Sequence, residues 1–488
     1  MPDENRARAT AREAIALLVG TAGFTEHRPP PRPLPPDGPL GWAGYDAARE
    51  RAAARTGEEE SVVYGSGVVG DRACVLLSFE FGFLGGSLGR STGDRLAAAY
   101  ELALTRRLPL LALVATGGSR MQEGMVALTQ LQRVAAASTR LRAAGLPQIA
   151  VVRDPTTGGG WATVGAGADV VLALPGAQVG FAGSRVRPPD ADPYAYSAEG
   201  QLAAGQVDAV VPREELATTV THWLRALGPH AATDAQPPSD TGPHTVAGAQ
   251  PPPDTGPHTV AGAHHAVPAA PVPRALSSAP SAPARLPETG REAVARARDP
   301  RRPRAEAYLA DYFAVRLPLH GDRSGSTDPG LLCGFGLRAD GRPVAYVAQC
   351  GTPTRPAGYR AAARTIRLAD RLGIPVLTLV DTPGAANDAE AERAGAGAAI
   401  ADTFAAIAAA RVPVTTLVIG EGGSGGALAL AAPDNTHVTA DSYFSVIAPE
   451  LAAAILKRPP AETGTTADQL RLRPQDLLEL GFARSIVG

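Results

Sequence analysis

Two long stretches of this 488-residue chain alternate apolar, strand-like runs with alanine-rich runs of helical length. In the first stretch, which spans 61–227, the strand-like runs are 73–81, 108–115 and 148–152, and the helix-like runs are 92–105 and 123–144. In the second stretch, which starts at Ala305, the strand-like runs are 343–348, 375–380 and 413–419, and the helix-like runs are 357–372 and 389–410. This alternation predicts an α/β fold in each half, built from repeated ββα or βαβ units.

The segment between the two stretches, 229–303, is rich in proline, alanine, threonine and histidine. It contains a tandem repeat of 14 residues, at 235–248 and again at 249–262. With almost no large apolar side chains, it cannot bury enough surface to fold. We therefore expect two domains, 1–228 and 304–488, joined by a disordered linker.

The composition excludes several classes of protein. A formal net charge of −2 gives no electrostatic reason to expect nucleic acid or an anionic membrane as partner. The three cysteines, Cys74, Cys333 and Cys350, lie far apart without a CxxC pair, so we expect neither disulfides nor a metal site such as a zinc ribbon. No apolar run reaches the roughly 18 residues of a membrane span, and the N-terminus lacks the order of a signal peptide, which favours a cytoplasmic protein.

Two distant segments, 115–124 and 419–427, share one pattern. In each, an apolar strand-like run breaks at paired glycines and continues into a helix of small residues. Glycines at such a break let the backbone approach a ligand and direct free N–H groups at it, and the start of the helix adds positive potential. Donors of this kind hold an oxyanion, so two of them predict a reaction in which negative charge develops on two oxygens, one on each reactant.

Several short motifs follow one another along the chain. They are EFGFLGGSLG at 80–89, TGGSRMQEG at 116–124, DPTTGG at 154–159 and GFAGSR at 180–185 in the first half, and HGDR at 320–323, PAGYR at 356–360, DTPG at 381–384, GEGGSGGA at 420–427 and YFSVIAPE at 443–450 in the second. On these motifs the chain resembles the two carboxyltransferase subunits of bacterial acetyl-CoA carboxylase. The β-like half comes first and the α-like half second.

The resemblance implies a crotonase-like fold in each half, in which ββα turns stack into a short superhelix. It implies a biotin-dependent carboxyltransferase that moves CO2 from carboxybiotin, held on a carrier protein, to the α-carbon of a short acyl-CoA, giving malonyl-CoA or a homologue. In that family the site lies between a β-type and an α-type domain, commonly from different protomers. A homodimer or larger homo-oligomer is therefore expected.

The chain also departs from the pattern of a complete biotin enzyme. A biotin carrier needs a lysine flanked by methionines, whereas Lys457, the only lysine, lies within Leu-Lys-Arg-Pro. No ATP-binding domain is recognisable either, so the biotin carboxyl carrier protein and the biotin carboxylase are expected on separate chains. The four-cysteine zinc ribbon with which the β-type subunit usually begins is missing, so the resemblance implies no metal.

Matching the motifs to the family assigns roles to individual residues. Gly117 and Gly118 would hold the enolate oxygen of the acyl-CoA, and Gly425, Gly426 and Ala427 the ureido oxygen of biotin. The carboxybiotin side would also include Gly422, Gly423, Gly358, Pro383 and Gly384. The acyl-CoA side would include Gly85, Gly86, Gly158, Gly159 and Arg120.

Two other functions stay open from the sequence. A biotin-independent decarboxylase of a malonyl thioester would use the same oxyanion chemistry in reverse, but it would not need the full 420–427 segment. A non-catalytic scaffold subunit is suggested by departures from the family such as the shortened, proline-rich stretch 186–193. The presence of both glycine-rich segments favours the carboxyltransferase.

Overall fold

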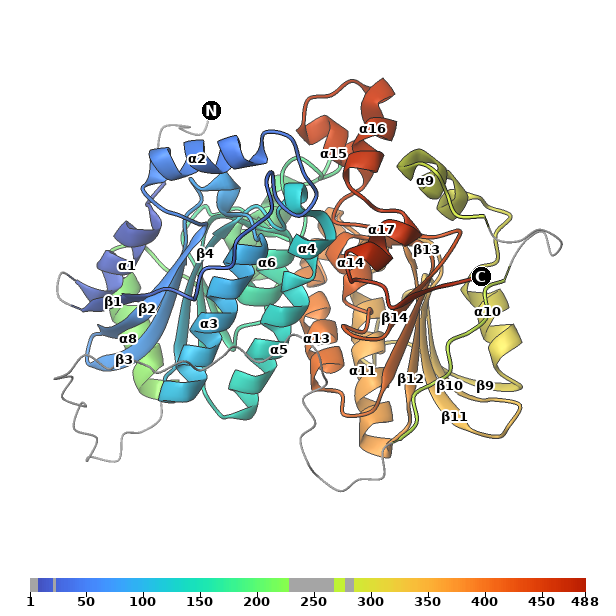
Figure 1. Ribbon diagram of the computed structural model, residues 1–488. Coiled ribbons are helices and arrows are strands. Elements are labelled where there is room, and N and C mark those ends of the chain that lie inside the picture. Colours follow the sequence, from blue (N-terminus) through green and yellow to red (C-terminus); the bar gives the residue numbers. More distant parts are fainter. Residues whose placement is uncertain (1–7, 21–22, 228–266, 277–284) are drawn as a thin grey trace, which may run out of the picture.

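The computed structural model describes residues 8–20, 23–227, 267–276 and 285–488, which form two α/β halves lying side by side (Figure 1). The N-terminal half contains α1 (Ala11–Val19), β1 (Phe24–His27), α2 (Tyr45–Thr56), β2 (Val62–Val69), β3 (Arg72–Phe79), η1 (Leu84–Gly86), α3 (Arg90–Arg106), β4 (Leu110–Thr116), η2 (Met121–Glu123), α4 (Gly124–Leu128), α5 (Gln130–Ala143), β5 (Gln148–Thr157), α6 (Gly158–Gly160), η3 (Trp161–Gly165), β6 (Val170–Ala173), β7 (Val179–Gly180), η4 (Pro193–Tyr196), α7 (Ala198–Ala203), β8 (Ala209–Val210) and α8 (Leu216–Leu227). The C-terminal half contains α9 (Gly290–Arg298), α10 (Ala305–Tyr312), β9 (Val315–Leu319), β10 (Leu331–Leu337), β11 (Pro343–Gln349), α11 (Pro356–Leu372), β12 (Val376–Thr382), α12 (Ala389–Arg393), α13 (Ala396–Ala409), β13 (Val414–Gly423), α14 (Ser424–Leu428), β14 (Thr436–Thr439), β15 (Tyr443–Ser445), α15 (Pro449–Ile455), η5 (Pro460–Glu462), α16 (Thr463–Gln469), α17 (Pro474–Glu479) and β16 (Ser485–Val487). In this described part of the chain, no helix has both the length and the hydropathy of a membrane span.

Each half is built on one eight-stranded sheet, and the two sheets share one strand order. The order is β1-β2-β3-β4-β5-β6-β8 in the N-terminal half, with β7 beside β5, and β9-β10-β11-β12-β13-β14-β16 in the C-terminal half, with β15 beside β13. In both sheets the first three strands pair antiparallel and the next ones pair parallel. An antiparallel hairpin followed by a helical crossover to a parallel strand is a ββα unit. The predicted α/β fold, with ββα units in each half, is confirmed.

The helices begin and end where the sequence permits. α11 starts with Pro356, whose missing N–H is not needed in a first turn, and stops at Gly373, which adopts the left-handed conformation of a helix C-cap (φ +67°). The run predicted as one helix at 389–410 is two helices, because Gly395 between α12 and α13 is also left-handed (φ +81°) and a right-handed helix cannot pass through it. The run predicted at 123–144 is likewise divided, into α4 and α5.

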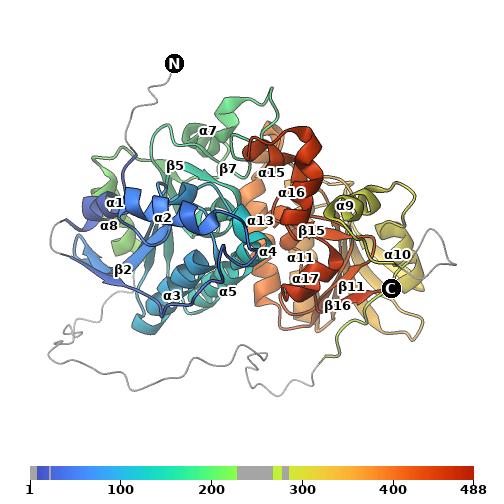
Figure 2. The same ribbon diagram turned by 45° about the horizontal axis from the view of Figure 1, so that its top comes forward.

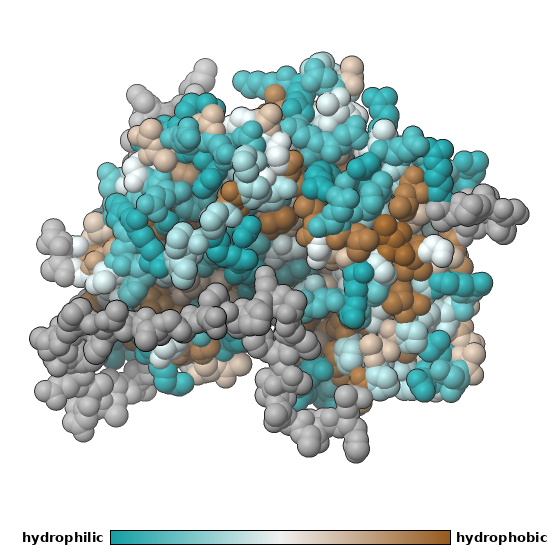
Figure 3. Space-filling model, viewed as in Figure 1, coloured by the Kyte–Doolittle hydropathy of each residue, from teal (hydrophilic) through white to brown (hydrophobic). Residues whose placement is uncertain are grey.

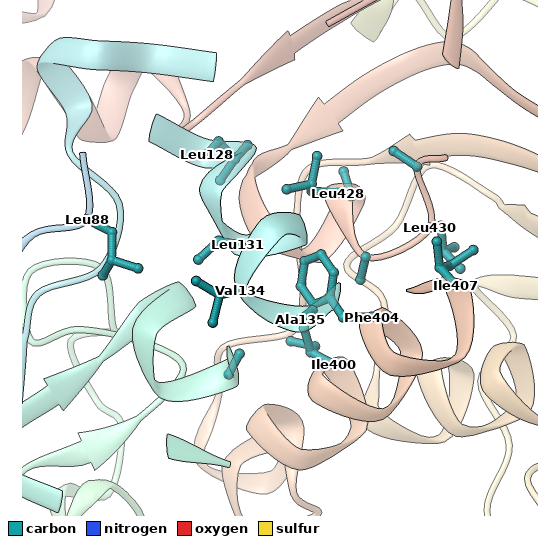
Figure 4. Packing of buried hydrophobic residues seen from close by; sticks show 14 of the residues in the cluster. Leu88, Leu128, Leu131, Val134, Ala135, Ile400, Phe404, Ile407, Leu428 and Leu430 are labelled. Atoms are coloured by element: carbon teal, nitrogen blue, oxygen red, sulfur yellow. The ribbon is translucent and has the colours of Figure 1, made fainter. Parts of the chain in front are cut away.

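One apolar core continues from the N-terminal half into the C-terminal half. Along the boundary, α5 packs against α13 (Figure 2). Leu131 and Val134 of α5 lie on one side, and Ile400 and Phe404 of α13 on the other; all four side chains are buried (Figure 4). Burial of each such side chain stabilises the fold by roughly 1.5–3 kcal/mol. The shared core therefore holds the two halves together. On the surface, Figure 3 shows apolar residues gathered in the middle of a largely hydrophilic face.

The linker predicted at 229–303 falls partly outside the described residues, and the whole tandem repeat is among those left out. Its described parts are ordered, which corrects the expectation of disorder there. Ala270 is buried on the C-terminal half, and its carbonyl accepts a hydrogen bond from the Thr415 hydroxyl at 2.7 Å. Further along, the chain forms α9, so the C-terminal domain includes α9 and does not start at residue 304.

Arg302, just after α9, explains why this part of the sequence folds. Its Nη2 lies 2.5 Å from Oδ1 of Asp381 at the end of β12, and the two side chains are only 4% and 0% exposed. Its Nε and Nη1 donate to the carbonyls of Ala297 and Ile419. Asp381 belongs to the DTPG motif, so a motif of the C-terminal half needs a residue that composition had assigned to the linker.

Arg302→Ala should destabilise the protein, because it leaves the Asp381 carboxylate buried without its main partner. Loss of one partner of a buried ion pair costs about 3–5 kcal/mol, which the midpoint of urea unfolding would report. Arg301→Ala is the matched control, since the Arg301 side chain is 83% exposed. Equal midpoints for the two variants would contradict the inclusion of Arg302 in the folded domain.

Candidate active site

The glycine-rich turns of the two halves occupy equivalent places, where central strands end. After a bulge, β4 resumes its pairing with β5 at Thr116 opposite Thr156, and β12 resumes its pairing with β13 at Thr382 opposite Gly422. The register therefore matches 117–118 with 383–384, here called the first turns, and 158–160 with 424–426, here called the second turns. The two segments that share a sequence pattern thus belong to non-equivalent turns.

In the first turn of the N-terminal half, both glycine amides are already hydrogen-bonded. Gly117 N donates to the Gly85 carbonyl at 2.9 Å, and Gly118 N donates to the Thr116 hydroxyl at 3.0 Å. Glycine is required at 118 because the backbone there has a φ of +100°. Since both amides are already bonded within the protein, the structure corrects the expectation that Gly117 and Gly118 hold the enolate oxygen.

The first turn of the C-terminal half is built in the same way. Gly384 N donates to the Thr382 hydroxyl at 3.1 Å, and Pro383 has no N–H. Thr116 and Thr382 are both fully buried, so each first turn is locked by a hydroxyl from the strand that leads into it. Pro383 and Gly384, which were expected on the carboxybiotin side, can shape the cleft but do not offer a free amide.

The second turns carry the free amides. They open α6 and α14, and the first N–H groups of a helix have no partner within the helix. Among the described residues, no acceptor bonds the amides of Gly159, Gly160, Gly425 or Gly426. All four glycines are buried, and Ala427 follows them in α14 with no exposed surface. These amides are the structure's candidates for holding oxyanions.

One leucine touches both second turns across the boundary between the halves. A β-carbon on Gly159 would lie 2.5 Å from Leu131 Cδ1, and one on Gly425 would lie 3.5 Å from the same atom. The ring of Phe181, just after β7, lies 3.8 Å from that position on Gly425. A single chain thus brings both sets of donors to one place, among apolar side chains.

Arg120, two positions after Gly118, is enclosed within the N-terminal half. Its side chain is 0% exposed, 2.5 Å from Oε1 of Glu60 and 3.4 Å from Oε1 of Glu123. Tyr45 of α2 also bonds Glu123, at 2.5 Å. Burial, the largest single influence, would raise the pKa of Glu60, but the charge and hydrogen bonds of Arg120 and the Ser61 amide together hold that pKa below its usual value. An enclosed guanidinium cannot reach a CoA phosphate, so the expected substrate contact of Arg120 is replaced by a structural role.

The other residues predicted for the site lie around these turns, mostly where two segments come close together. Without room for a β-carbon, Gly86 passes the Ala115 carbonyl, Gly422 the Phe444 ring, Gly423 the Pro383 carbonyl, Gly358 the Asp328 carboxylate, and Gly158 the Gly118 α-carbon. Gly85 differs, since nothing lies within 4 Å of the place where its β-carbon would be. Most of these glycines therefore build the turns, and Gly85 is the one that faces open space.

Different families of known proteins match the two halves of the chain. Carboxyl transferase domain proteins match residues 37–228, and acetyl co-enzyme A carboxylase carboxyltransferase-like proteins match 285–488. The acetyl-coenzyme A carboxylase carboxyl transferase subunits beta/alpha of Saccharopolyspora erythraea are 36% identical over 485 residues, which cover 96% of this chain and 76% of that protein. The protein of the same description from Salinispora arenicola is 38% identical, with 98% and 82% covered. The chain belongs to the acetyl-CoA carboxylase carboxyltransferase family.

Membership of this family confirms the resemblance seen in the motifs, and with it a biotin-dependent enzyme that transfers carboxyl groups. The carboxyltransferase-like match begins at residue 285, before α9, as does the folded domain. Among solved structures, transcarboxylase 12S is similar over 98% of this chain and 87% of that chain, at 21% identity and a TM-score of 0.39.

Sequence reasoning overlooked four residues of this candidate site: Thr116, Thr382, Gly160 and Leu131. The two threonines had a usable signal, because each stands directly before the first turn, in ATGG and in DTPG. Alignment of the halves on this threonine would have matched the turns correctly. Leu131 had no such signal, because the sequence around a leucine inside a helix does not indicate which residues it contacts across a domain boundary.

Glu60→Gln should destabilise the N-terminal half, because Arg120 then stays buried with less compensating charge. The expected loss is about 3–5 kcal/mol in the free energy of unfolding, measured with denaturant. Glu59→Gln is the control, as the neighbouring Glu59 side chain is 63% exposed. A raised KM for acyl-CoA with unchanged unfolding would instead restore Arg120 as a substrate contact.

Proposed function

We propose that this protein is the carboxyltransferase component of an acetyl-CoA or short-chain acyl-CoA carboxylase. It transfers CO2 from carboxybiotin on a separate carrier protein to the α-carbon of the acyl-CoA, giving malonyl-CoA or a homologue. The observation that carries the proposal is the meeting of both second turns at Leu131, each with unbonded amides. The substrate class is supported by the relatives, which are named as subunits of acetyl-coenzyme A carboxylase.

The reaction needs two oxyanion sites, since charge develops on the thioester oxygen of one reactant and on the ureido oxygen of the other. We assign the amides of Gly159 and Gly160 to the thioester oxygen, and those of Gly425 and Gly426 to the ureido oxygen. Each fixed donor in a dry site is worth about 3–4 kcal/mol of transition-state stabilisation. Carboxybiotin supplies the activated carboxyl group and a ring nitrogen that can take the α-proton, so no side chain of the protein has to act as general base.

The second turn of the C-terminal half fits a ureido group. Around the position of a Gly425 β-carbon, the nearest atoms belong to Leu131 and Phe181, at 3.5–3.9 Å. A β-carbon-sized group therefore fits beside the turn, among apolar neighbours that keep water away. An amide–oxygen interaction is stronger where water is excluded.

The proposed partners are an acyl-CoA, a biotin carboxyl carrier protein and a biotin carboxylase, the last two on separate chains. The chain has no carrier-type lysine, since Lys457 is not flanked by methionines. Within the described residues, no group of three or more His, Cys, Asp or Glu side chains could hold a metal ion. The family resemblance suggests a homodimer or a larger homo-oligomer, although in this chain the two second turns already meet within one protomer.

Gly425→Ala should abolish most turnover while leaving the fold intact. The added methyl group meets its neighbours at ordinary contact distances of 3.5–3.9 Å, but it occupies the space beside the donor amide. A displacement of about 1 Å at a reacting centre costs about 100-fold in rate. Gly23→Ala, also at ordinary contact distances, is the control for the substitution itself. Wild-type rates in Gly425→Ala would refute the assignment of the second turns.

The reverse reaction tests the proposed activity directly. With malonyl-CoA and free biotin or biocytin, the purified protein should release acetyl-CoA only when the biotin compound is present. Release without biotin would assign a decarboxylase. No release with malonyl-CoA or methylmalonyl-CoA would point to another acyl-CoA or to a non-catalytic subunit.

A further inference from the structure

A buried carboxylate crosses the boundary between the halves beside the second turns. Glu392, in α12 of the C-terminal half, is 1% exposed. Its Oε2 accepts the Phe181 amide at 3.0 Å and its Oε1 accepts the Ala182 amide at 2.8 Å, both from the N-terminal half. A β-carbon on Gly180 would lie 3.1 Å from the same carboxylate. One side chain of one half thus bonds two consecutive residues of the other and lies close to a third.

The peptide unit between Phe181 and Ala182 continues this contact to a second turn. Its N–H donates to Glu392, and its carbonyl accepts from Gly158 N at 3.1 Å. A peptide that donates and accepts at once is polarised by both bonds, so each strengthens the other. Gly158 directly precedes Gly159 and Gly160. Through these hydrogen bonds, the position of Glu392 influences where the free amides of Gly159 and Gly160 lie.

We propose that Glu392 is a positioning residue for carboxyl transfer: from the C-terminal half, it holds the donor amides of the N-terminal half in place opposite Gly425. The inference rests on the function proposed for the second turns. Phe181 joins the two sides, because its amide is held by Glu392 while its ring lies 3.8 Å from the β-carbon position of Gly425. Glu392 itself need not touch a substrate.

The surroundings of Glu392 make this role depend on pH. Burial raises the pKa of Glu392 to about 7, although the hydrogen bonds from Ala182 and Phe181 and the charge of Arg187 lower it; the charge of Asp388 raises it further. The charged and titratable groups that face this region are Arg187, Tyr196, Asp388 with its partner Arg355, and Arg393 with its partner Asp192. The pKa of Tyr196 is raised to about 12, so its hydroxyl stays neutral where Glu392 titrates.

Protonation of Glu392 leaves one good acceptor oxygen for two amides, so the tie to Phe181 and Ala182 loosens as pH falls through about 7. Turnover should fall with it. Stability should move in the opposite direction: the folded-state pKa lies above the ordinary 4.5, so the folded state binds the extra proton first, and this group's contribution to stability rises as pH falls from about 7 towards 4.5. Opposite trends in turnover and stability separate positioning from a merely structural role.

Glu392→Gln tests the proposal, with Glu390→Gln as matched control, because the Glu390 side chain lies on the same helix and is 82% exposed. At about pH 8, Glu392→Gln should lower kcat of the biotin-dependent reverse reaction about tenfold and leave KM for malonyl-CoA within about twofold. It should also remove the acid limb near pH 7, which the wild type and Glu390→Gln retain. An unchanged kcat together with an unchanged acid limb would overturn the proposal.

Amide hydrogen exchange in the full-length protein gives a readout that does not need activity. Exchange at Phe181, Ala182 and Gly158 should be faster in Glu392→Gln than in Glu390→Gln. If this holds while the wild type transfers no carboxyl group, the hydrogen-bonded link stands and the proposed function fails. If the wild type is active and exchange does not change, the positioning role fails. Should Glu392→Gln not fold, the wild-type profile decides, and the absence of an acid limb near pH 7 would overturn the proposal.

Discussion

A buried amide without an acceptor costs about 1–3 kcal/mol, and the site described above depends on keeping four of them open. The open amides belong to the second turns, at Gly159, Gly160, Gly425 and Gly426. The first turns have the same strand-to-turn geometry, yet their amides are closed by the hydroxyls of Thr116 and Thr382. One set of turns is thus a fixed support for the other. In the proposed mechanism, the reacting oxygens bind only to the turns whose amides have no acceptor within the fold.

Each half also holds the second turn of the other. Glu392 of the C-terminal half bonds the segment that supports Gly158, while Gln132 of the N-terminal half donates its Nε2 to the Ala431 carbonyl, just beyond α14, at 2.8 Å. Gln132 stands next to Leu131, which touches both second turns. The apolar boundary supplies most of the attraction between the halves, and polar contacts such as these two contribute to their alignment. Neither donor turn could therefore take its position in an isolated half.

Sequence reasoning predicted the architecture closely and the donors only in part. The alternation of strands and helices was enough for the fold, since each ββα unit is a local pattern, although β13 extends through Gly423, beyond the predicted end of its strand at 419. The C-terminal glycines Gly425 and Gly426, which we propose as donors, were also among the residues predicted from the sequence. Gly117 and Gly118 were misassigned because glycine pairs mark where a backbone can approach a ligand, whereas a donor also needs an unbonded N–H. The acceptors that bond these two amides, the Gly85 carbonyl and the Thr116 hydroxyl, are brought into place by the tertiary structure, so the sequence does not show them.

The same reasoning accounts for the two misjudged arginines. Arg302 was placed in a linker by the composition around it, and Arg120 was placed at a substrate by its motif, but both are buried partners of carboxylates beside a first turn. Asp381 directly precedes Thr382, and Arg120 follows Gly118 by two positions. A buried ion pair adds little net stability, but its geometry tolerates few alternatives. We infer that these pairs fix the strand ends from which the first turns, and hence the second turns, take their positions. Charge in these two pairs thus serves backbone geometry, and in the proposed mechanism the chemistry is left to uncharged amides.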